Sequence, residues 1–210
     1  MSEPSISVLL VDDHSLVRRG FRRMLEDDAA ITVVGEAEDG HTAVQLAAEL
    51  RPRVVVMDFA MPSMNGAVAA RHILRAAPEI AILILSMHAE ASYVRTCLDA
   101  GVRGYLLKNA MDLEMVSAVK QVAAGKQVLD PRVGTLDAPG SSPTPPLTTR
   151  ELEVLQLIVH GKSNKEIAAV LSLSANTVAV HRANIMQSLG IHNTAELVVY
   201  AIRQGLVSIA

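Results

Sequence analysis

Five polar side chains each follow a short apolar run of this sequence, and together they have the chemistry of a metal and phosphate site. They are Asp12 and Asp13 after "LLV", Asp58 after "VVVM", Ser86 after "ILIL" and Lys108 after "YLL". Carboxylates that lie close together repel, so an ion or a proton has to compensate their charge. Mg²⁺ suits such a cluster because it prefers oxygen ligands and keeps waters that a phosphate oxygen can replace.

Asp58 is the residue of this set that we expect to be modified. Its apolar run, residues 54–57, holds the carboxylate at the edge of a core, where an unpaired charge is costly. A carboxylate can attack a phosphoryl donor and give an acyl phosphate. Lys108 and the cation would neutralise the transferring group, and Ser86 could hydrogen-bond its oxygens. The alternative is that Asp13 caps a helix and Lys108 is a solvated strand end, but five such residues at strand ends favour the functional interpretation.

Strand-length apolar runs and helical stretches alternate from residue 6 to about residue 124. The runs are "ISVLLV", "ITVVGEA", "VVVMD", "AILILS" and "GYLLK", and an amphipathic stretch follows each of them. Runs that are apolar at successive positions are typical of strands buried on both faces. The alternation predicts a doubly wound α/β domain with a five-stranded parallel sheet. The polar residues would then meet at the carboxyl edge of the sheet, where ligands of such folds bind.

The composition changes after this α/β half. Residues 136–146, "LDAPGSSPTPP", are rich in Pro, Gly and Ser, as is typical of a linker. Beyond them, "TTRE", "SNKE" and "NTAE" each place a capping residue three positions before a Glu, which indicates a helix start. We therefore expect an α/β domain over 1–125, a linker over 126–146 and an all-α domain of four short helices over 147–210.

The composition also fits a cytoplasmic protein without disulfides. Half of the 210 residues are hydrophobic, and the single cysteine, Cys97, cannot form an internal disulfide. We expect Cys97 to be a small buried hydrophobe. The apolar runs are too short to cross a bilayer, and the first of them does not resemble a signal peptide, so no membrane partner is expected.

The stretches "VDDH", "MDFAMPSMNG", "LSMHAE" and "GYLLK" resemble the receiver domain of two-component response regulators, and the likeness covers residues 6–124. The resemblance implies a flavodoxin-like strand order and Asp58 as the phosphoacceptor. It also implies Mg²⁺ as the cofactor, bound by Asp13, Asp58 and the backbone carbonyl of Ala60, with Asp12 acting through a water.

The same resemblance implies a switch. Ser86 and Tyr105 would be the switch pair, and Lys108 would bind the phosphate. Phosphorylation adds about −1.5 to −2 charges, so Ser86 would move toward the new group and leave space into which Tyr105 rotates. The alternative for Tyr105 is an ordinary half-buried tyrosine. Phe59, where the family more often has an aliphatic residue, should affect packing only.

Residues Leu147 to Leu206 resemble the LuxR-type helix-turn-helix domain of NarL/FixJ-type regulators. The recognition helix would cover residues 174–189, with Val178, Ile185 and Leu189 packed inward. The residues that we expect at the DNA are Lys162, Lys165, Asn176, Thr177, Ala179, Val180, Arg182, Ala183, Asn184 and Gln187. The basic residues, with Thr177 and Asn184, would contact phosphates. Asn176 and Gln187 could hydrogen-bond to base edges, and the apolar residues could contact thymine methyl groups. The alternative for Gln187 is that it only faces solvent.

The charge of this helical half leaves two functions open. Residues 147–210 carry five Lys and Arg against four Glu, a net charge of +1, although phosphate neutralisation supplies most non-specific DNA affinity. The main interpretation is a non-enzymatic transcription regulator that a sensor histidine kinase phosphorylates on Asp58 and that binds double-stranded DNA half-sites as a homodimer.

The alternative is a signalling adaptor whose phosphorylated receiver binds a protein while the helical domain has weak or lost DNA affinity. The low positive charge of the helical domain motivates this alternative. A phosphatase that uses Asp58 as its nucleophile is disfavoured, because Ala60 stands where the acid/base carboxylate would be needed.

Overall fold

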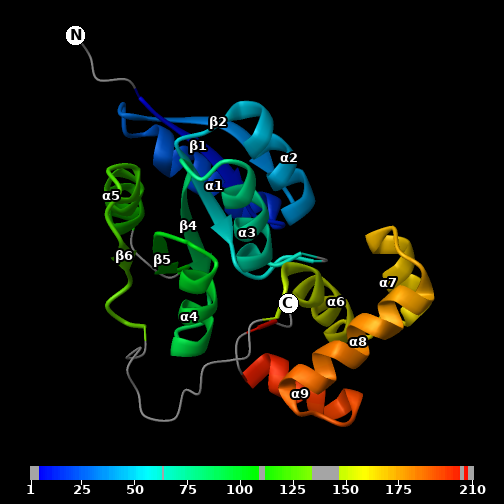
Figure 1. Cartoon of the computed structure of the whole chain (residues 1–210). Coiled ribbons are helices and arrows are strands. Elements are labelled where there is room, and N and C mark those ends of the chain that lie inside the picture. The colour runs from blue at the N-terminus through cyan, green and yellow to red at the C-terminus, as the bar shows by residue number, and fades with distance from the viewer. Residues whose placement is uncertain (1–4, 63, 109–111, 134–146, 204–205, 208–210) are drawn as a thin grey trace. The chain divides into compact units, whose positions relative to one another are not determined.

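The computed structural model describes residues 5–62, 64–108, 112–133, 147–203 and 206–207 (Figure 1). The chain divides into two compact units, Met1–Gly134 and Thr135–Ala210, and each is described by itself. Most of the predicted linker, residues 134–146, lies outside the described residues. Within the described ranges, no helix has the length and apolarity that crossing a membrane would require.

The first unit alternates strands and helices around one sheet, as Figure 1 shows. Its elements are β1 (Ile6–Val11), α1 (Ser15–Glu26), β2 (Ile31–Ala37), α2 (Gly40–Leu50), β3 (Val54–Asp58), α3 (Gly66–Ala76), β4 (Ala81–Ser86), α4 (Ala91–Asp99), β5 (Gly104–Leu107), α5 (Asp112–Ala123) and β6 (Val128–Leu129). All strand pairs are parallel, in the order β2-β1-β3-β4-β5-β6. The predicted doubly wound α/β fold with a flavodoxin-like order is confirmed.

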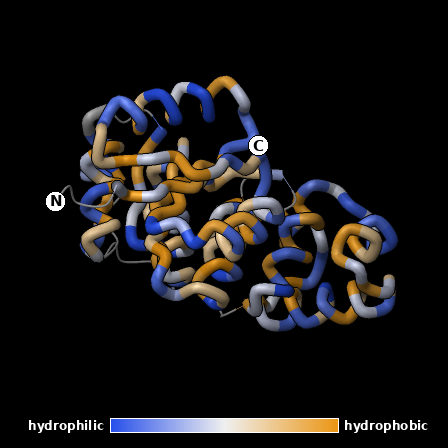
Figure 2. The backbone as a smooth tube through the Cα atoms, turned by 90° about the horizontal axis from the view of Figure 1, so that it is seen from above, coloured by the Kyte–Doolittle hydropathy of each residue, from blue (hydrophilic) through white to orange (hydrophobic). Residues whose placement is uncertain are grey.

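The core of the first unit lies on both faces of the sheet. On one face, Leu25 of α1 and Met115 of α5 pack on alternate strand residues such as Leu10 and Val56. Figure 2 shows hydrophobic and hydrophilic residues alternating along the helices, the pattern of helices with one buried side. Burying each large aliphatic side chain contributes about 1.5–3 kcal/mol, which fixes the strands that carry the polar ends. Cys97 of α4 is buried, as predicted.

The number of strands differs from the prediction. The described residues form six strands instead of five, because Val128 and Leu129, in the segment expected to be linker, pair with Gly104 and Tyr105 of β5. A strand of two residues has no periodicity that a sequence pattern can reveal. The sheet therefore extends one strand beyond the predicted end of the α/β domain, and the fold class is unchanged.

The second unit contains the predicted helices α6 (Thr149–Val159), α7 (Asn164–Leu171), α8 (Ala175–Leu189) and α9 (Thr194–Arg203). Complete capping boxes begin two of them, at Thr148 with Glu151 and at Ser163 with Glu166. Buried Ile167, Val178, Ile185, Leu197 and residues of α6 form the core. Leu189, which was also expected to pack inward, is half-buried.

Candidate functional site

The carboxyl edge of the sheet carries all five polar residues that follow the apolar runs of the sequence. Asp58 and Ser86 are the last residues of β3 and β4, Asp12 and Asp13 follow β1, and Lys108 follows β5. Asp12, Asp58 and Ser86 are almost fully buried, whereas Asp13 and Lys108 keep partial exposure. Parallel strands end at the same edge, so neighbouring strands produce this cluster directly.

Lys108 joins the two buried carboxylates. Its Nζ lies 2.9 Å from Asp12 Oδ2 and 2.8 Å from Asp58 Oδ2. Burial raises the pKa of Asp58 to about 6, against the opposing effect of the Lys108 ammonium. Burial would lower the pKa of Lys108, but the two carboxylates raise it above its usual value. Lys108 therefore stays charged, and Asp58 is ionised at neutral pH.

The donor set of this edge suits a hard divalent cation. Asp12, Asp13, His14 and Asp58 place one ligand atom each within 4.8 Å of one another. In the part of the chain that the structure describes, the buried Asp13 Oδ1 accepts no hydrogen bond, as expected of an oxygen that serves as a metal ligand. These residues therefore fit the predicted Mg²⁺. The Ala60 amide donates 3.2 Å to Asp58 Oδ1, so Ala60 adjoins the cluster.

Ser86 and Tyr105 are connected through His88 and by a hydrogen bond between their own side chains. Ser86 Oγ accepts a 3.1 Å bond from the His88 amide, and the Tyr105 hydroxyl donates 2.7 Å to the His88 carbonyl. Tyr105 is fully buried, not half-buried, and burial raises the pKa of its hydroxyl. The His88 ring stacks on Tyr93 at 4.1 Å, and Phe59 meets Tyr93 edge-on at 5.3 Å. Phe59 thus packs beside the segment that connects the two predicted switch residues.

Two supporting residues of this edge were missed by sequence reasoning. Arg18 Nη1 donates 2.6 Å to the Asp12 carbonyl, and Arg18 Nε donates 2.9 Å to Glu36 of β2. At Gly66, a Cβ atom would lie 2.6 Å from the Asp58 carbonyl oxygen. The position of Gly66 eight residues after Asp58 gave a weak signal for a close approach, whereas Arg18 gave none, because a bond to a main-chain oxygen leaves no residue pattern.

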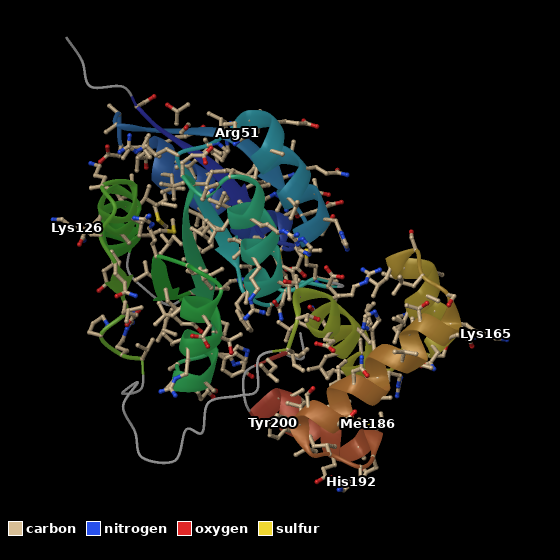
Figure 3. All side chains as sticks on the ribbon, viewed as in Figure 1. Arg51, Lys126, Lys165, Met186, His192 and Tyr200 are labelled. Atoms are coloured by element: carbon tan, nitrogen blue, oxygen red, sulfur yellow. The ribbon has the colours of Figure 1, made fainter. Side chains whose placement is uncertain are left out.

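The residues expected at the DNA lie mostly at the surface of the second unit. Exposed side chains include Lys162, Lys165, Asn176, Thr177, Ala179, Val180, Ala183, Asn184 and Gln187. Figure 3 shows Lys165, which belongs to α7, at the surface of this unit. Arg182 differs, because its guanidinium donates 3.2 Å to Asn164 and 3.1 Å to Thr194, tying α8 to α7 and to the start of α9. Its contribution is therefore at least partly structural.

Comparison with known proteins gives the same two-part division. Residues 8–120 match the response regulator receiver domain, and residues 145–201 match the bacterial regulatory proteins of the luxR family. The chain is 34% identical over 231 residues to the transcriptional regulatory protein DegU of Brevibacillus brevis, covering 100% of this chain and 98% of that protein. It is 39% identical over 208 residues to the response regulator UvrY of Escherichia coli K12, covering 96% and 95%.

A solved structure also resembles this chain. The complex of the two-component response regulator RcsB with DNA aligns with a TM-score of 0.59 at 28% identity, and the alignment covers 93% of this chain and 97% of that one.

Proposed function

Because this chain belongs to the response regulators that join a receiver domain to a LuxR-type DNA-binding domain, we propose that it is a transcription regulator switched by phosphorylation of Asp58. The observation that carries the proposal is the buried Asp58 carboxylate, paired with Lys108 at 2.8 Å. A structural ion pair needs no second buried carboxylate, yet Asp12 shares the same ammonium. Concentrated charge of this kind is typical of a site for phosphoryl transfer.

The transfer follows from the positions of the side chains. An ionised Asp58 oxygen attacks the phosphorus of a phosphohistidine on a sensor kinase, so that a carboxylate O–P bond forms while the P–N bond breaks and the imidazole leaves. The Lys108 ammonium, already beside Asp58, neutralises the phosphoryl oxygens. The Asp12, Asp13 and Asp58 carboxylates and the Ala60 carbonyl would hold Mg²⁺. When bound, this ion supplies further charge neutralisation and orients the phosphoryl group.

The response passes from the phosphoryl group to the segment after β4. Ser86 Oγ turns from the His88 amide toward the new acceptor oxygens, and this removes the 3.1 Å bond that fixes the start of the segment. His88 also accepts the Tyr105 hydroxyl bond, so the two predicted switch residues respond together. A changed surface near α4 and β5 would favour a homodimer, which presents two recognition helices to related DNA half-sites.

The phosphoacceptor role is tested by mass analysis. The full chain, incubated with Mg²⁺ and acetyl phosphate, should gain one phosphoryl group, and Asp58→Asn should gain none. Size analysis with a phosphoryl mimic should show a shift toward dimer that Asp58→Asn abolishes. Absence of a mass gain in the unmodified chain would overturn the proposal.

A phospho-dependent adaptor is the second candidate function. The +1 charge of residues 147–210 and the engagement of Arg182 by Asn164 and Thr194 favour it. Gel-shift assays with the phosphorylated chain at low and moderate salt separate the two. Binding to upstream DNA fragments that weakens as salt rises supports the transcription regulator, and no binding at either salt concentration supports the adaptor.

A further inference from the structure

We propose that His14 is a nitrogen ligand of the cation at the phosphorylation site, and that this site therefore takes transition-metal ions such as Ni²⁺ and Co²⁺ more tightly than Mg²⁺. The inference rests on the proposed function, because the cation is the one that Asp12, Asp13 and Asp58 would hold. It changes the chemistry of that site from oxygen ligands alone to a mixed set of oxygen and imidazole nitrogen.

The distances around His14 fit ligands of a single ion. His14 Nδ1 lies 2.8 Å from Asp13 Oδ1 and 3.5 Å from Asp12 Oδ1. Adjacent ligands that each lie about 2.1 Å from an octahedral ion stand about 3.0 Å apart, and opposite ligands stand about 4.2 Å apart. With Asp58 included, the four ligand atoms span no more than 4.8 Å. One ion can therefore reach all four residues after small side-chain shifts.

The unsatisfied oxygen of Asp13 points to the same ligand set. Asp13 Oδ1 is buried and has no hydrogen-bond partner in the described part of the chain, although the His14 ring nitrogen is only 2.8 Å away. The two atoms approach each other without hydrogen-bond geometry. A cation bound between them would satisfy both lone pairs at once, because each atom is a metal-ligand donor.

In the described part of the chain, the ion-pair contacts of the His14 ring are with carboxylates of the cluster itself. His14 is the N-cap residue of α1, but its side chain makes no capping hydrogen bond. Its backbone amide donates 2.8 Å to Asp12 Oδ1, and its carbonyl accepts 3.0 Å from the Arg18 amide. These backbone bonds fix the residue beside the carboxylates. The side chain is 65% exposed, so the ring can turn into the site and an ion can enter from solvent.

An imidazole ligand changes which ions the site prefers. Carboxylates, carbonyls and waters suit Mg²⁺, whereas imidazole suits borderline ions, whose affinities rise from Mn²⁺ through Co²⁺ to Ni²⁺. Removing a group that only supports a ligand typically lowers metal affinity by about 10–100-fold. We therefore expect His14→Ala to lower the Ni²⁺ affinity of the site by at least about tenfold, with a much smaller change for Mg²⁺.

The decisive experiment uses Mn²⁺ as a spectroscopic probe of the full chain. Pulsed electron paramagnetic resonance detects a nitrogen that is directly bound to Mn²⁺. We expect nitrogen coupling in the unmodified chain and its loss in His14→Ala, while His41→Ala, with a histidine outside the cluster, keeps it. Excess Mg²⁺ and Asp13→Asn should both remove the signal, which assigns it to this site. Calorimetric titrations with Ni²⁺ and Mg²⁺ then measure the preference in each variant.

The outcomes separate this inference from the proposed function. Mn²⁺ that binds and is displaced by Mg²⁺ without nitrogen coupling overturns the role of His14 and leaves the phosphorylation site intact. Coupling that persists in His14→Ala, or an unchanged ratio of Ni²⁺ to Mg²⁺ affinity, overturns it as well. A chain that binds none of these ions contradicts the metal site of the proposed function and the inference together.

Discussion

The Tyr105 hydroxyl donates a hydrogen bond of 2.7 Å to the backbone carbonyl of His88. The amide of His88 donates to Ser86, the last residue of β4, so one residue bridges the two side chains expected to act as a switch. Tyr105 is fully buried, and its ring fills space inside the first unit. Movement of Ser86 and the position of Tyr105 are therefore coupled through the main chain of His88 and through the hydrogen bond between the Ser86 and Tyr105 side chains.

Tyr105→Phe tests the structural value of that bond. The substitution keeps the ring but leaves the His88 carbonyl without this donor, so we expect the receiver domain to lose about 1 kcal/mol of unfolding free energy. Phosphorylation of Asp58 should persist, since Tyr105 does not contact that carboxylate. Urea unfolding measures the first effect and mass analysis the second. Tyr200→Phe, in α9, should leave the unfolding transition of the receiver unchanged. An equal loss in both variants would show that the Tyr105 hydrogen bond to His88 does not stabilise the receiver.

Arg18→Met should weaken Mg²⁺ binding without unfolding the domain. Arg18 donates to the Asp12 carbonyl at 2.6 Å and so positions the β1–α1 connection. We expect the Mg²⁺ concentration for half-maximal phosphorylation to rise by about tenfold. Arg22→Met is the matched control, because Arg22 shares Glu36 with Arg18. Equal shifts in the two variants would show that the loss of the ion pairs with Glu36, and not the bond to Asp12, is responsible.

Gly66→Ala should displace the strand end that carries Asp58. The added Cβ would lie 2.6 Å from the Asp58 carbonyl oxygen and 3.1 Å from Ile84 Cδ1, closer than packed atoms tolerate. We expect the unfolding free energy of the receiver domain to fall by about 1–3 kcal/mol and phosphorylation of Asp58 to become slower. Gly20→Ala is the control, because a Cβ at Gly20 in α1 meets nothing within 4 Å and should stabilise the helix by about 0.5–1 kcal/mol. Chemical unfolding of both variants shows whether Gly66→Ala lowers the unfolding free energy and Gly20→Ala raises it.

The residues at the strand ends could be predicted because a physical rule connects their positions. Buried parallel strands appear as apolar runs, and their carboxyl ends share one edge, so Asp12, Asp58, Ser86 and Lys108 were expected together from the sequence. The capping boxes of α6 and α7 were visible for the same reason, since the bonds join residues three positions apart.

Other contacts leave no such pattern. Arg18 bonds to a main-chain oxygen, and Arg182 reaches Asn164 and Thr194, which are 18 and 12 residues away. The surface pattern of α8 suggested that Arg182 was a DNA contact, but the guanidinium also has partners in neighbouring helices. Only the tertiary fold brings such groups together. β6 was missed because two residues are too short for a period.

Lys165→Ala should affect DNA binding alone, whereas Arg182→Ala should also affect the stability of the helical domain. Lys165 is exposed, so its removal should weaken DNA binding similarly across sequences and reduce the salt slope by about 1. Arg182→Ala should in addition lower the unfolding free energy of the helical domain by about 1 kcal/mol, because two interhelical hydrogen bonds are lost. Binding across a salt series and thermal unfolding distinguish the effects. A stability loss in Lys165→Ala and none in Arg182→Ala would contradict these assignments.

Asp130 ties the segment after β6 to the strand that carries Tyr105. Its side chain is almost fully buried, accepts 3.1 Å from the Leu107 amide, and pairs with Arg132 at 2.6 Å. The Asp130 amide donates 2.8 Å to the Tyr105 carbonyl. The chain that leaves the receiver domain is thus bonded to β5 directly before Lys108.

This arrangement makes a pH-dependent prediction for Asp130→Asn. The Arg132 hydrogen bond holds the pKa of Asp130 below its usual value of 3.8, so the ionised carboxylate is the stabilising form. Its contribution is complete above pH 3.8 and is lost as the pH falls through the lowered pKa. We expect Asp130→Asn to cost about 1–2 kcal/mol at pH 7, where the charged pair is intact. The difference between variant and parent in urea unfolding should shrink below about pH 4. A difference that stays constant from pH 7 to pH 3 would show that the carboxylate charge contributes nothing to holding this segment.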